Sequence, residues 1–339
     1  MKKFFRSLNF PAKLSLALLV FFYLVAIFAD FIAPYPYTEQ NRRMPYAPPT
    51  RIYFDGWRPY IYEYKLVNIH DRTYEEVKDK KYYIQFWTED HRLFGVDSKK
   101  ARLFLLGSDT LGRDLFSRIV YGSRVSMAIG PIGVLITFTI GIIVGSISGY
   151  AGGSIDNLLM RLCELLMSIP SFYFLVALAV TIPSGIPPAA TFIIIVVILS
   201  FIGWAGFARI IRGMVLSVKE MDYVQATTAL GASNGRVLFR HIIPNIFNYT
   251  IVAATLSIPG YILGEASLSL IGLGISEPQP SLGNLLSAAT NAQAIMNYPW
   301  ILSPGVVIFL IVMSFQFLGD AIRDYVDPKG LHQAQHFKK

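Results

Sequence analysis

The chain alternates between long runs of apolar residues and short polar segments, and the lengths of the runs predict membrane helices. A helix needs about 20 apolar residues to cross the hydrocarbon layer, because every backbone polar group there must be hydrogen-bonded within the segment. We therefore expect an all-α polytopic membrane protein with six spans. They lie at 14–33, 125–150, two within 165–208, 246–270 and 301–319.

Local sequence signals divide these runs further. The uncharged stretch 165–208 is too long for one helix, and Pro-Ser-Gly-Ile-Pro-Pro at 183–188 is a strong turn signal between two spans. Segment 281–300 mixes apolar residues with Asn, Gln and Ser, so we expect a loop with a short surface or re-entrant helix there. Glycines in the second span predict close packing of neighbouring helices. They are Gly130, Gly133, Gly141 and Gly145.

A polar insert at 35–105 separates the first two spans. It is Pro-rich at its start and then dense in Tyr, Trp and charge, and alternating runs such as 81–87 predict strands. We expect a small, mostly β or mixed, extracytoplasmic unit that leans on the membrane helices or on a partner, because so small a core is marginal by itself. The expected division is thus 1–34 (N-terminus and first span), 35–105 (insert), 106–328 (five further spans) and 329–339 (tail).

Composition and charge support this picture. Hydrophobic residues make up 53% of the 339 residues and charged residues 15%, against about 25% charged in a typical soluble domain. Of the 30 Lys and Arg, 14 lie outside 35–124, and all 14 fall on one side if the N-terminus is cytoplasmic. That is the positive-inside pattern, which predicts cytoplasmic N- and C-termini. The net charge of +8 thus indicates orientation in lipid rather than a nucleic-acid partner.

Sequence motifs for nucleotide binding, catalysis or metal binding are sparse. The dipeptide Gly-Lys does not occur, so the chain has no Walker A loop for ATP phosphates, and it has no H-E-x-x-H zinc motif. We expect no enzymatic activity, no cofactor and no metal site. The single cysteine, Cys163, lies in an apolar run and excludes an intrachain disulfide.

Segment 219–245 is the longest polar stretch between the later spans and predicts two short helices. A helix over 221–230 would start beside acidic residues and end at Gly231, which can adopt a positive φ. Ser233 can cap a second helix, on which Arg236 and Arg240 share a face, and Pro244 would start the next span. These features alone also fit an ordinary surface hairpin.

The same segment resembles the signature loop of ABC-transporter permeases, E-A-A-x-x-x-G followed at fixed spacing by a proline before a membrane helix. Gln225, Ala226 and Thr227 stand at the E-A-A positions, Gly231 at the glycine and Pro244 at the proline. The glutamine keeps the shape of the family's glutamate and loses its charge. The resemblance implies an ATPase-coupling loop. Its residues would be Gln225, Ala226, Gly231, Arg236, Arg240, His241 and Pro244.

Longer blocks resemble the C-type permease of the oligopeptide, dipeptide and nickel importers. They are LGSDTLGRDLFSRIVYGSRVSM from Leu106, GYAGGSIDNLLMRLCELLMSIP from Gly149, GEASLSLIGLG from Gly264 and FLGDAIRDYVDP from Phe317. The resemblance implies the type I importer permease fold in a bacterial or archaeal inner membrane. It also implies a pathway shared with a homologous second permease, two ATP-binding subunits and an extracytoplasmic substrate-binding protein, with peptides as the expected cargo.

Two further interpretations concern charged residues near or within the spans. Glu265 is a carboxylate within an apolar helix, so it is either a pathway residue or a structural hydrogen-bonding group to a neighbouring helix. The charged residues before the second span, at 109–124, predict a salt-bridged elbow. A self-contained secondary transporter is the alternative function, but it should show internal repeats and more intramembrane charge; a polytopic membrane enzyme is third, since catalytic motifs are sparse.

Overall fold

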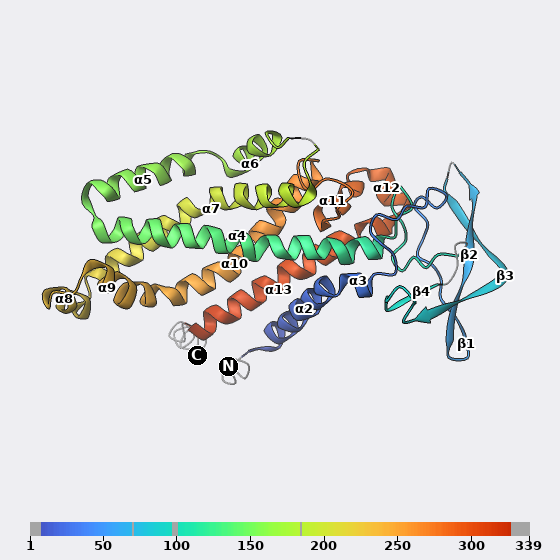
Figure 1. Ribbon diagram of the computed structural model, residues 1–339, viewed down its shortest axis with the longest axis horizontal. Coiled ribbons are helices and arrows are strands. Elements are labelled where there is room, and N and C mark those ends of the chain that lie inside the picture. The colour runs from blue at the N-terminus through green and yellow to red at the C-terminus, as the bar shows by residue number, and fades with distance from the viewer. Residues whose placement is uncertain (1–7, 70, 97–100, 184, 327–339) are drawn as a thin grey trace, which may run out of the picture.

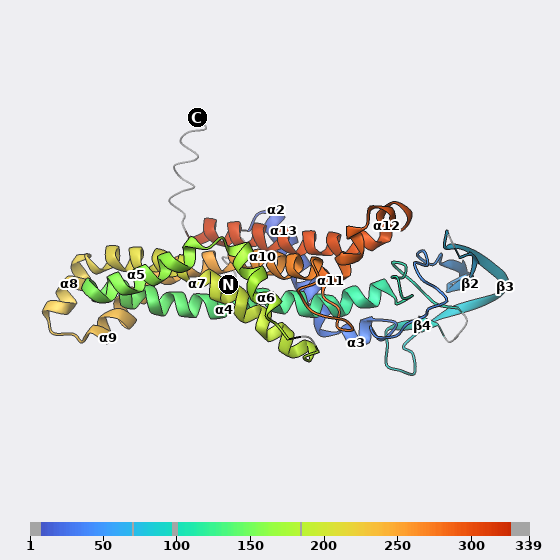
Figure 2. The ribbon, with the colours of Figure 1, turned by 90° about the horizontal axis from the view of Figure 1, so that it is seen from above.

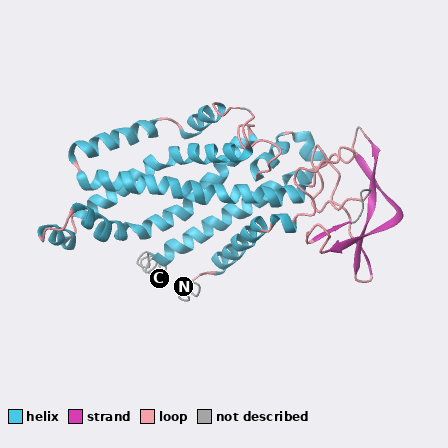
Figure 3. Ribbon diagram, viewed as in Figure 1, coloured by secondary structure: helices cyan, strands magenta, loops and turns pink. Residues whose placement is uncertain are grey.

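The computed structural model describes residues 8–69, 71–96, 101–183 and 185–326. The basic residues at positions 2, 3 and 6, which the orientation prediction counts, and the tail at 329–339 lie outside the described residues. Long helices form an elongated bundle with a small sheet at one end (Figures 1 and 3). The main helices are α2 (Phe10–Ile27), α3 (Ala29–Ile32), α4 (Leu115–Ala151), α5 (Gly153–Ser168), α6 (Ser171–Val180), α7 (Pro188–Lys219), α10 (Ile243–Leu270) and α13 (Ser303–Val326).

Among the described residues, five helical runs are long and apolar enough to cross a membrane, or six if the bent pair α5–α6 is one span. The six predicted spans are found in this sense. The prediction placed the start of the third span at residue 165, but the helix starts at Gly153. The run then bends by 81° between α5 and α6. Ile169 there is extended (φ −85°, ψ 124°), because a residue before proline is kept out of the helical region and Pro170 has no N–H to continue the helix.

Helix α4 is longer than the predicted second span. Asp114 caps its N-terminus, accepting a hydrogen bond from the Ser117 backbone N–H at 2.7 Å. Its 37 residues correspond to about 55 Å, nearly twice the roughly 30 Å of the hydrocarbon core. Arg118 and Arg124, expected to precede this span, therefore lie on its first turns.

The predicted salt-bridged elbow is confirmed. Arg113 and Arg118 both donate to Asp109 Oδ2, at 2.6 Å each, and both also pair with Glu277 from the segment after α10. Arg124 pairs with Asp30 at 3.0 Å. These ion pairs join the start of α4 to the end of the first span and to a segment about 160 residues away.

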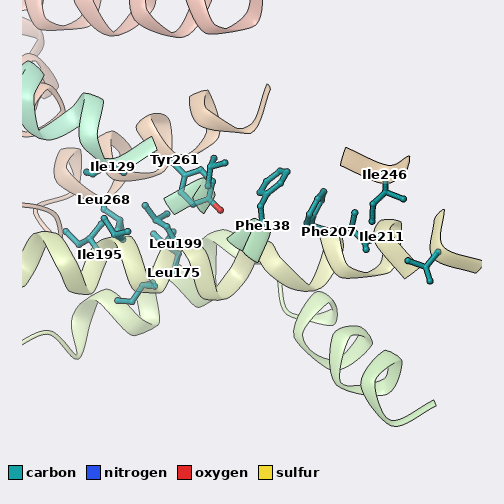
Figure 4. Packing of buried hydrophobic residues seen from close by; sticks show 14 of the residues in the cluster. Ile129, Phe138, Leu175, Ile195, Leu199, Phe207, Ile211, Ile246, Tyr261 and Leu268 are labelled. Atoms are coloured by element: carbon teal, nitrogen blue, oxygen red, sulfur yellow. The ribbon is translucent and has the colours of Figure 1, made fainter. Parts of the chain in front are cut away.

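Close helix packing at the predicted glycines is also confirmed. A Cβ on Gly145 of α4 would lie 2.4 Å from the Ala208 carbonyl oxygen of α7, and one on Gly133 would lie 2.4 Å from the Tyr261 ring of α10. Neither contact leaves room for a side chain. Helices α4, α7 and α10 thus share a core, which includes Phe138, Phe207 and Leu199 (Figure 4).

The insert contains the predicted strands. One antiparallel sheet has the order β1-β2-β3-β4, with β1 (Tyr53–Asp55), β2 (Arg58–Asn68), β3 (Thr73–Phe86) and β4 (Phe94–Val96). It leans on the helices as expected: Tyr35 N donates to Ser117 Oγ at 3.1 Å, and Arg92 Nη1 donates to the Ala33 carbonyl at 2.7 Å.

The segment before α13 also follows its prediction, since it has short helices and no seventh span. Ser281 and Asn284 form a capping box at the first of them. These elements are α11 (Leu282–Leu286), η2 (Ser287–Thr290), α12 (Ala292–Asn297) and η3 (Pro299–Leu302).

Candidate functional site: a helical hairpin between α7 and α10

The predicted loop at 219–245 is a helical hairpin at the end of the molecule opposite the sheet (Figures 1 and 2). It contains α8 (Asp222–Ala229), α9 (Asn234–Val237) and a wide turn, η1 (Leu238–Ile242), which leads into α10. Val224, Val237 and Ile242 are buried and belong to the same apolar cluster as Val215 and Val218 of α7. The hairpin is therefore packed against the bundle.

Gly231 makes the turn between the two helices, with φ +83° as predicted. The Gly231 N–H donates to the Thr228 carbonyl at 3.0 Å, and the Ala232 N–H donates to the Thr227 carbonyl at 3.3 Å. This pair of bonds is the Schellman motif, which satisfies the last carbonyls of a helix. A Cβ on Gly231 would meet nothing within 4 Å, so the glycine is needed for its backbone conformation and not for space.

The second half of the hairpin differs in two details from the prediction. Ser233 stands at the N-cap of α9, but its side chain makes no capping hydrogen bond. Before Pro244 the helix widens, and the Ile243 N–H donates to the carbonyl of Leu238, five residues back. The proline ring would clash with the carbonyl four residues earlier in a regular α-helix, and the wide turn relieves that clash.

Residues 231–235 read Gly-Ala-Ser-Asn-Gly, which has the G-x-S-x-G spacing of a serine-hydrolase elbow. An elbow places its serine on a sharp turn between a strand and a helix. Here Ser233 lies between two helices, α8 and α9, of the hairpin. The structural context of the motif is therefore missing at this serine.

The outer surface of the hairpin carries the predicted site residues. Gln225, Ala226, Gly231, Arg236, Arg240 and Pro244 are exposed, and His241 is half-buried. Two large apolar side chains are also exposed, Leu230 at 89% and Phe239 at 72%. Neither apolar residue was identified from the sequence, because exposure depends on what the fold leaves uncovered.

Side-chain hydrogen bonds of Gln225 and Asn245 connect the hairpin to the helices on either side of it. Gln225 Nε2 donates to the Glu220 carboxylate at 3.1 Å and to its backbone carbonyl at 3.3 Å. Asn245 Nδ2 donates to the Tyr223 hydroxyl at 2.6 Å and to the His241 carbonyl at 2.7 Å. The hairpin thus connects back to both α7 and α10.

Tyr150, at the end of α4, links a further helix to the hairpin and to the end of α7. Its hydroxyl donates to Asn234 Oδ1 at 3.1 Å, and its carbonyl accepts a hydrogen bond from Lys219 Nζ at 3.0 Å. The Lys219 ammonium also lies 5.4 Å from the centre of the Tyr150 ring. Sequence reasoning missed this contact, since the partners are about 70 to 85 residues apart and no local pattern connects them.

A largely apolar cavity of about 600 Å³ lies farther along the bundle, lined by residues of α4, α6, α7 and α10. Thr137 and Tyr261 meet in its wall with 2.5 Å between their hydroxyl oxygens, and Figure 4 shows Tyr261 near Leu199 and Phe138. No charged side chain lines this cavity among the described residues.

Glu265 does not line that cavity, although it lies in the same helix α10. Its side chain is fully buried, and Oε1 accepts a hydrogen bond from Ser269 Oγ at 2.6 Å. Of the two interpretations, this geometry favours a structural group. Ser269 lies in the same helix, and the carboxylate also interacts with the side chain of Ser281, the N-cap residue of the neighbouring helix α11, as expected.

Comparisons with known proteins agree with this architecture. The family model described as binding-protein-dependent transport system inner membrane component matches residues 141–330, and the N-terminal TM domain of oligopeptide transport permease C matches residues 4–49. The oligopeptide transport system permease protein OppC of Bacillus subtilis (strain 168) is 37% identical over 70% of this chain and 75% of its own. OppC of Haemophilus influenzae is 40% identical over 66% and 70%. The dipeptide transport system permease protein DppC of Bacillus subtilis is 40% identical over 66% and 68%.

Proposed function

Because this chain belongs to the family of binding-protein-dependent transport system inner membrane components, we propose that it is the permease subunit of an ATP-driven peptide importer. It would form the translocation pathway together with a homologous second permease. Separate ATPase subunits would bind ATP, and an extracytoplasmic binding protein would deliver the cargo. The names of the relatives, which are oligopeptide and dipeptide permeases, support peptides as the cargo.

The observation that carries this proposal is the helical hairpin. Leu230 and Phe239 expose large apolar surfaces at the end of a unit whose other face is packed on α7 through Val224 and Val237. Apolar side chains that fill a partner's pocket dominate the energy of many interfaces. Force applied to this exposed surface would pass directly into α7 and α10, which line the 600 Å³ cavity.

The 600 Å³ cavity within the bundle supports the proposal that peptides pass along this chain. An uncharged wall with a few hydroxyl groups suits peptides of many sequences, because no fixed charge selects one side chain. One permease supplies one such wall, and the second permease would enclose the pathway from the other side.

The orientation that we propose places the hairpin in the cytoplasm and the sheet outside. The positive-inside rule supports it, because this orientation assigns the described basic residues outside 35–124 to the cytoplasmic side. They are Lys13, Arg161, Arg209, Arg212, Lys219, Arg236, Arg240 and Arg323. In that orientation the insert faces the compartment from which a binding protein would arrive. The chain would then reside in the inner membrane of a bacterium or archaeon, with both termini cytoplasmic.

Reconstitution with and without the candidate ATPase subunits tests the proposal. We expect uptake of a labelled oligopeptide into proteoliposomes only with ATP and both partner types present. Leu230→Ala should reduce co-purification of the ATPase subunits at least tenfold. Val67→Ala, an exposed aliphatic residue at the sheet end, is the matched control and should change nothing. Uptake by the chain alone, driven by an ion gradient, would instead establish a secondary transporter.

A further inference from the structure

A second cavity, of about 770 Å³, lies at the sheet end of the molecule. Its two walls come from distant parts of the sequence: Tyr46, Arg72 and Tyr74 from the insert, and Asn297, Tyr298 and Trp300 from the segment before α13. The rings of Tyr46 and Tyr298 stack across the junction, 4.2 Å apart and 8° from parallel. This contact fixes one wall against the other.

Arg72 is the distinctive residue of this cavity. It lies at the turn between β2 and β3 with φ +50°, and its guanidinium carbon is 4.8 Å from the centre of the Tyr46 ring. Its Nη1 atom is buried and has no hydrogen-bond partner among the described residues. A buried donor without an acceptor is unfavourable, so an acceptor supplied by a ligand would be bound strongly at this point.

The surroundings of Arg72 favour a carboxylate as that acceptor. The planar guanidinium fork matches a carboxylate in bidentate geometry. Arg72 is half-buried and its Nη1 atom is buried, and shielding from water strengthens such a charge-assisted hydrogen bond.

The other wall adds groups that pair with a peptide backbone. The side-chain amides of Gln293 and Asn297 line the cavity and make no hydrogen bond to the described residues. The cavity also contains one carboxylate, Asp71, whose Oδ2 accepts a hydrogen bond from Asn68 at 2.6 Å. One charge of each sign, with amides beside them, matches a short peptide with free termini.

We infer that this cavity binds the free carboxyl end of a short peptide, with Arg72 donating to the carboxylate and the amides of Gln293 and Asn297 pairing with the last peptide bond. The choice of a peptide rests on the proposed function, whereas the recognition of a carboxylate rests on the cavity alone. The site would hold cargo at the sheet end, separately from the uncharged cavity within the bundle.

Calorimetric titration of the purified full-length chain in detergent tests the site without any partner or ATP. Trialanine should bind, and its C-terminal amide should bind at least tenfold more weakly. Arg72→Gln should weaken trialanine binding at least tenfold and remove the difference between the two peptides. Arg51→Gln, which changes an exposed arginine of the insert outside this cavity, is the matched control and should bind as the wild type does.

A second pair of variants keeps the test valid if Arg72→Gln fails to fold. Asn297 is exposed, so its replacement leaves the fold intact: Asn297→Asp should weaken trialanine binding by repelling the carboxylate, and Asn297→Lys should strengthen it. Equal binding by Arg72→Gln and by both Asn297 variants would overturn the site. So would equal affinity for N-acetyl-Ala-Glu-Ala-amide, which would assign the cavity to an acidic side chain of a partner protein. Peptide uptake that persists in either case would leave the proposed function standing.

Discussion

Arg212 and Asp156 form a bidentate ion pair that joins α7 to the first turn of α5. Arg212 Nε and Nη2 donate to the two carboxylate oxygens at 2.6 and 2.5 Å, and Ser148 of α4 donates to Asp156 Oδ1 at 2.5 Å. Three helices therefore meet at one carboxylate. The pair lies in the half of α7 that continues into the hairpin, so it belongs to the support of that unit.

Removing Arg212 should destabilise the chain. Arg212→Gln leaves the largely buried carboxylate of Asp156 with Ser148 alone, and we expect a loss of about 2 kcal/mol in the free energy of unfolding, typical of a hydrogen-bonded charge. The measurement is the melting temperature in detergent. Arg161→Gln is the matched control, because the Arg161–Glu164 pair is 83% and 45% exposed and exposed pairs contribute about 0–1 kcal/mol. Equal shifts for both variants would contradict this assignment.

Gly231 should be intolerant of side chains for a conformational reason. Its φ of +83° makes Gly231→Ala cost about 1–2 kcal/mol and a β-branched residue more, so Gly231→Val should misalign α8 and α9. We expect a loss of ATPase binding and of peptide uptake at normal membrane levels. Gly235→Ala should be neutral or slightly stabilising, since Gly235 lies in α9 without a positive φ and with nothing within 4 Å of an added Cβ. Normal uptake by Gly231→Val would argue against the coupling role.

Gln225 should respond differently to removal and to added charge. Gln225→Ala loses the two exposed hydrogen bonds to Glu220 and should change stability by less than about 0.5 kcal/mol. Gln225→Glu would place a second carboxylate about 3 Å from the Glu220 carboxylate, where Gln225 Nε2 now lies at 3.1 Å. Hydrogen exchange at residues 222–232 should accelerate at pH 7 in Gln225→Glu and remain unchanged in Gln225→Ala. Unchanged exchange in both variants would show that this contact does not stabilise α8.

Asp114 should give the stability a pH dependence. Burial raises the pKa of its carboxyl from 3.8 to about 7, so between these values the folded chain retains a proton that the unfolded chain has lost. The contribution of Asp114 to the free energy of unfolding is therefore most favourable below pH 4. It becomes less favourable as the pH rises from 4 to 7, and it is constant above pH 7. Asp114→Asn, which keeps a capping oxygen, should remove this slope and raise the melting temperature at pH 8. An exposed control, Asp90→Asn, should leave the profile parallel to that of the wild type, and a parallel profile for Asp114→Asn would refute the assignment.

The proposed orientation is open to cysteine labelling in whole cells. With Cys163 replaced, Trp57→Cys in the sheet should react with an impermeant thiol reagent, because Trp57 is 99% exposed on the proposed outer side. Ser233→Cys in the hairpin should react only after the cells are opened. Labelling of Ser233→Cys in intact cells would reverse the proposed orientation.

Much of the fold could be predicted from the sequence, because its causes are local. The lengths of the apolar runs determine the spans, the proline-rich segment at 183–188 separates α6 from α7, and alternation predicts strand β3. The positive φ of Gly231 follows from the helix end before it. The family motif then identifies the hairpin as the candidate site, since its residues lie close together in the chain.

Other features depend on contacts between distant residues, and only the tertiary structure decided them. The direction of the Glu265 side chain and the junction of Tyr150 with Asn234 and Lys219 both depend on which helices become neighbours. The exposure of Leu230 and Phe239 and the cavity beside Arg72 likewise arise where segments distant in the sequence meet or fail to cover each other. Sequence patterns record the preferences of neighbouring residues along the chain, whereas burial and cavities depend on the simultaneous packing of all the elements.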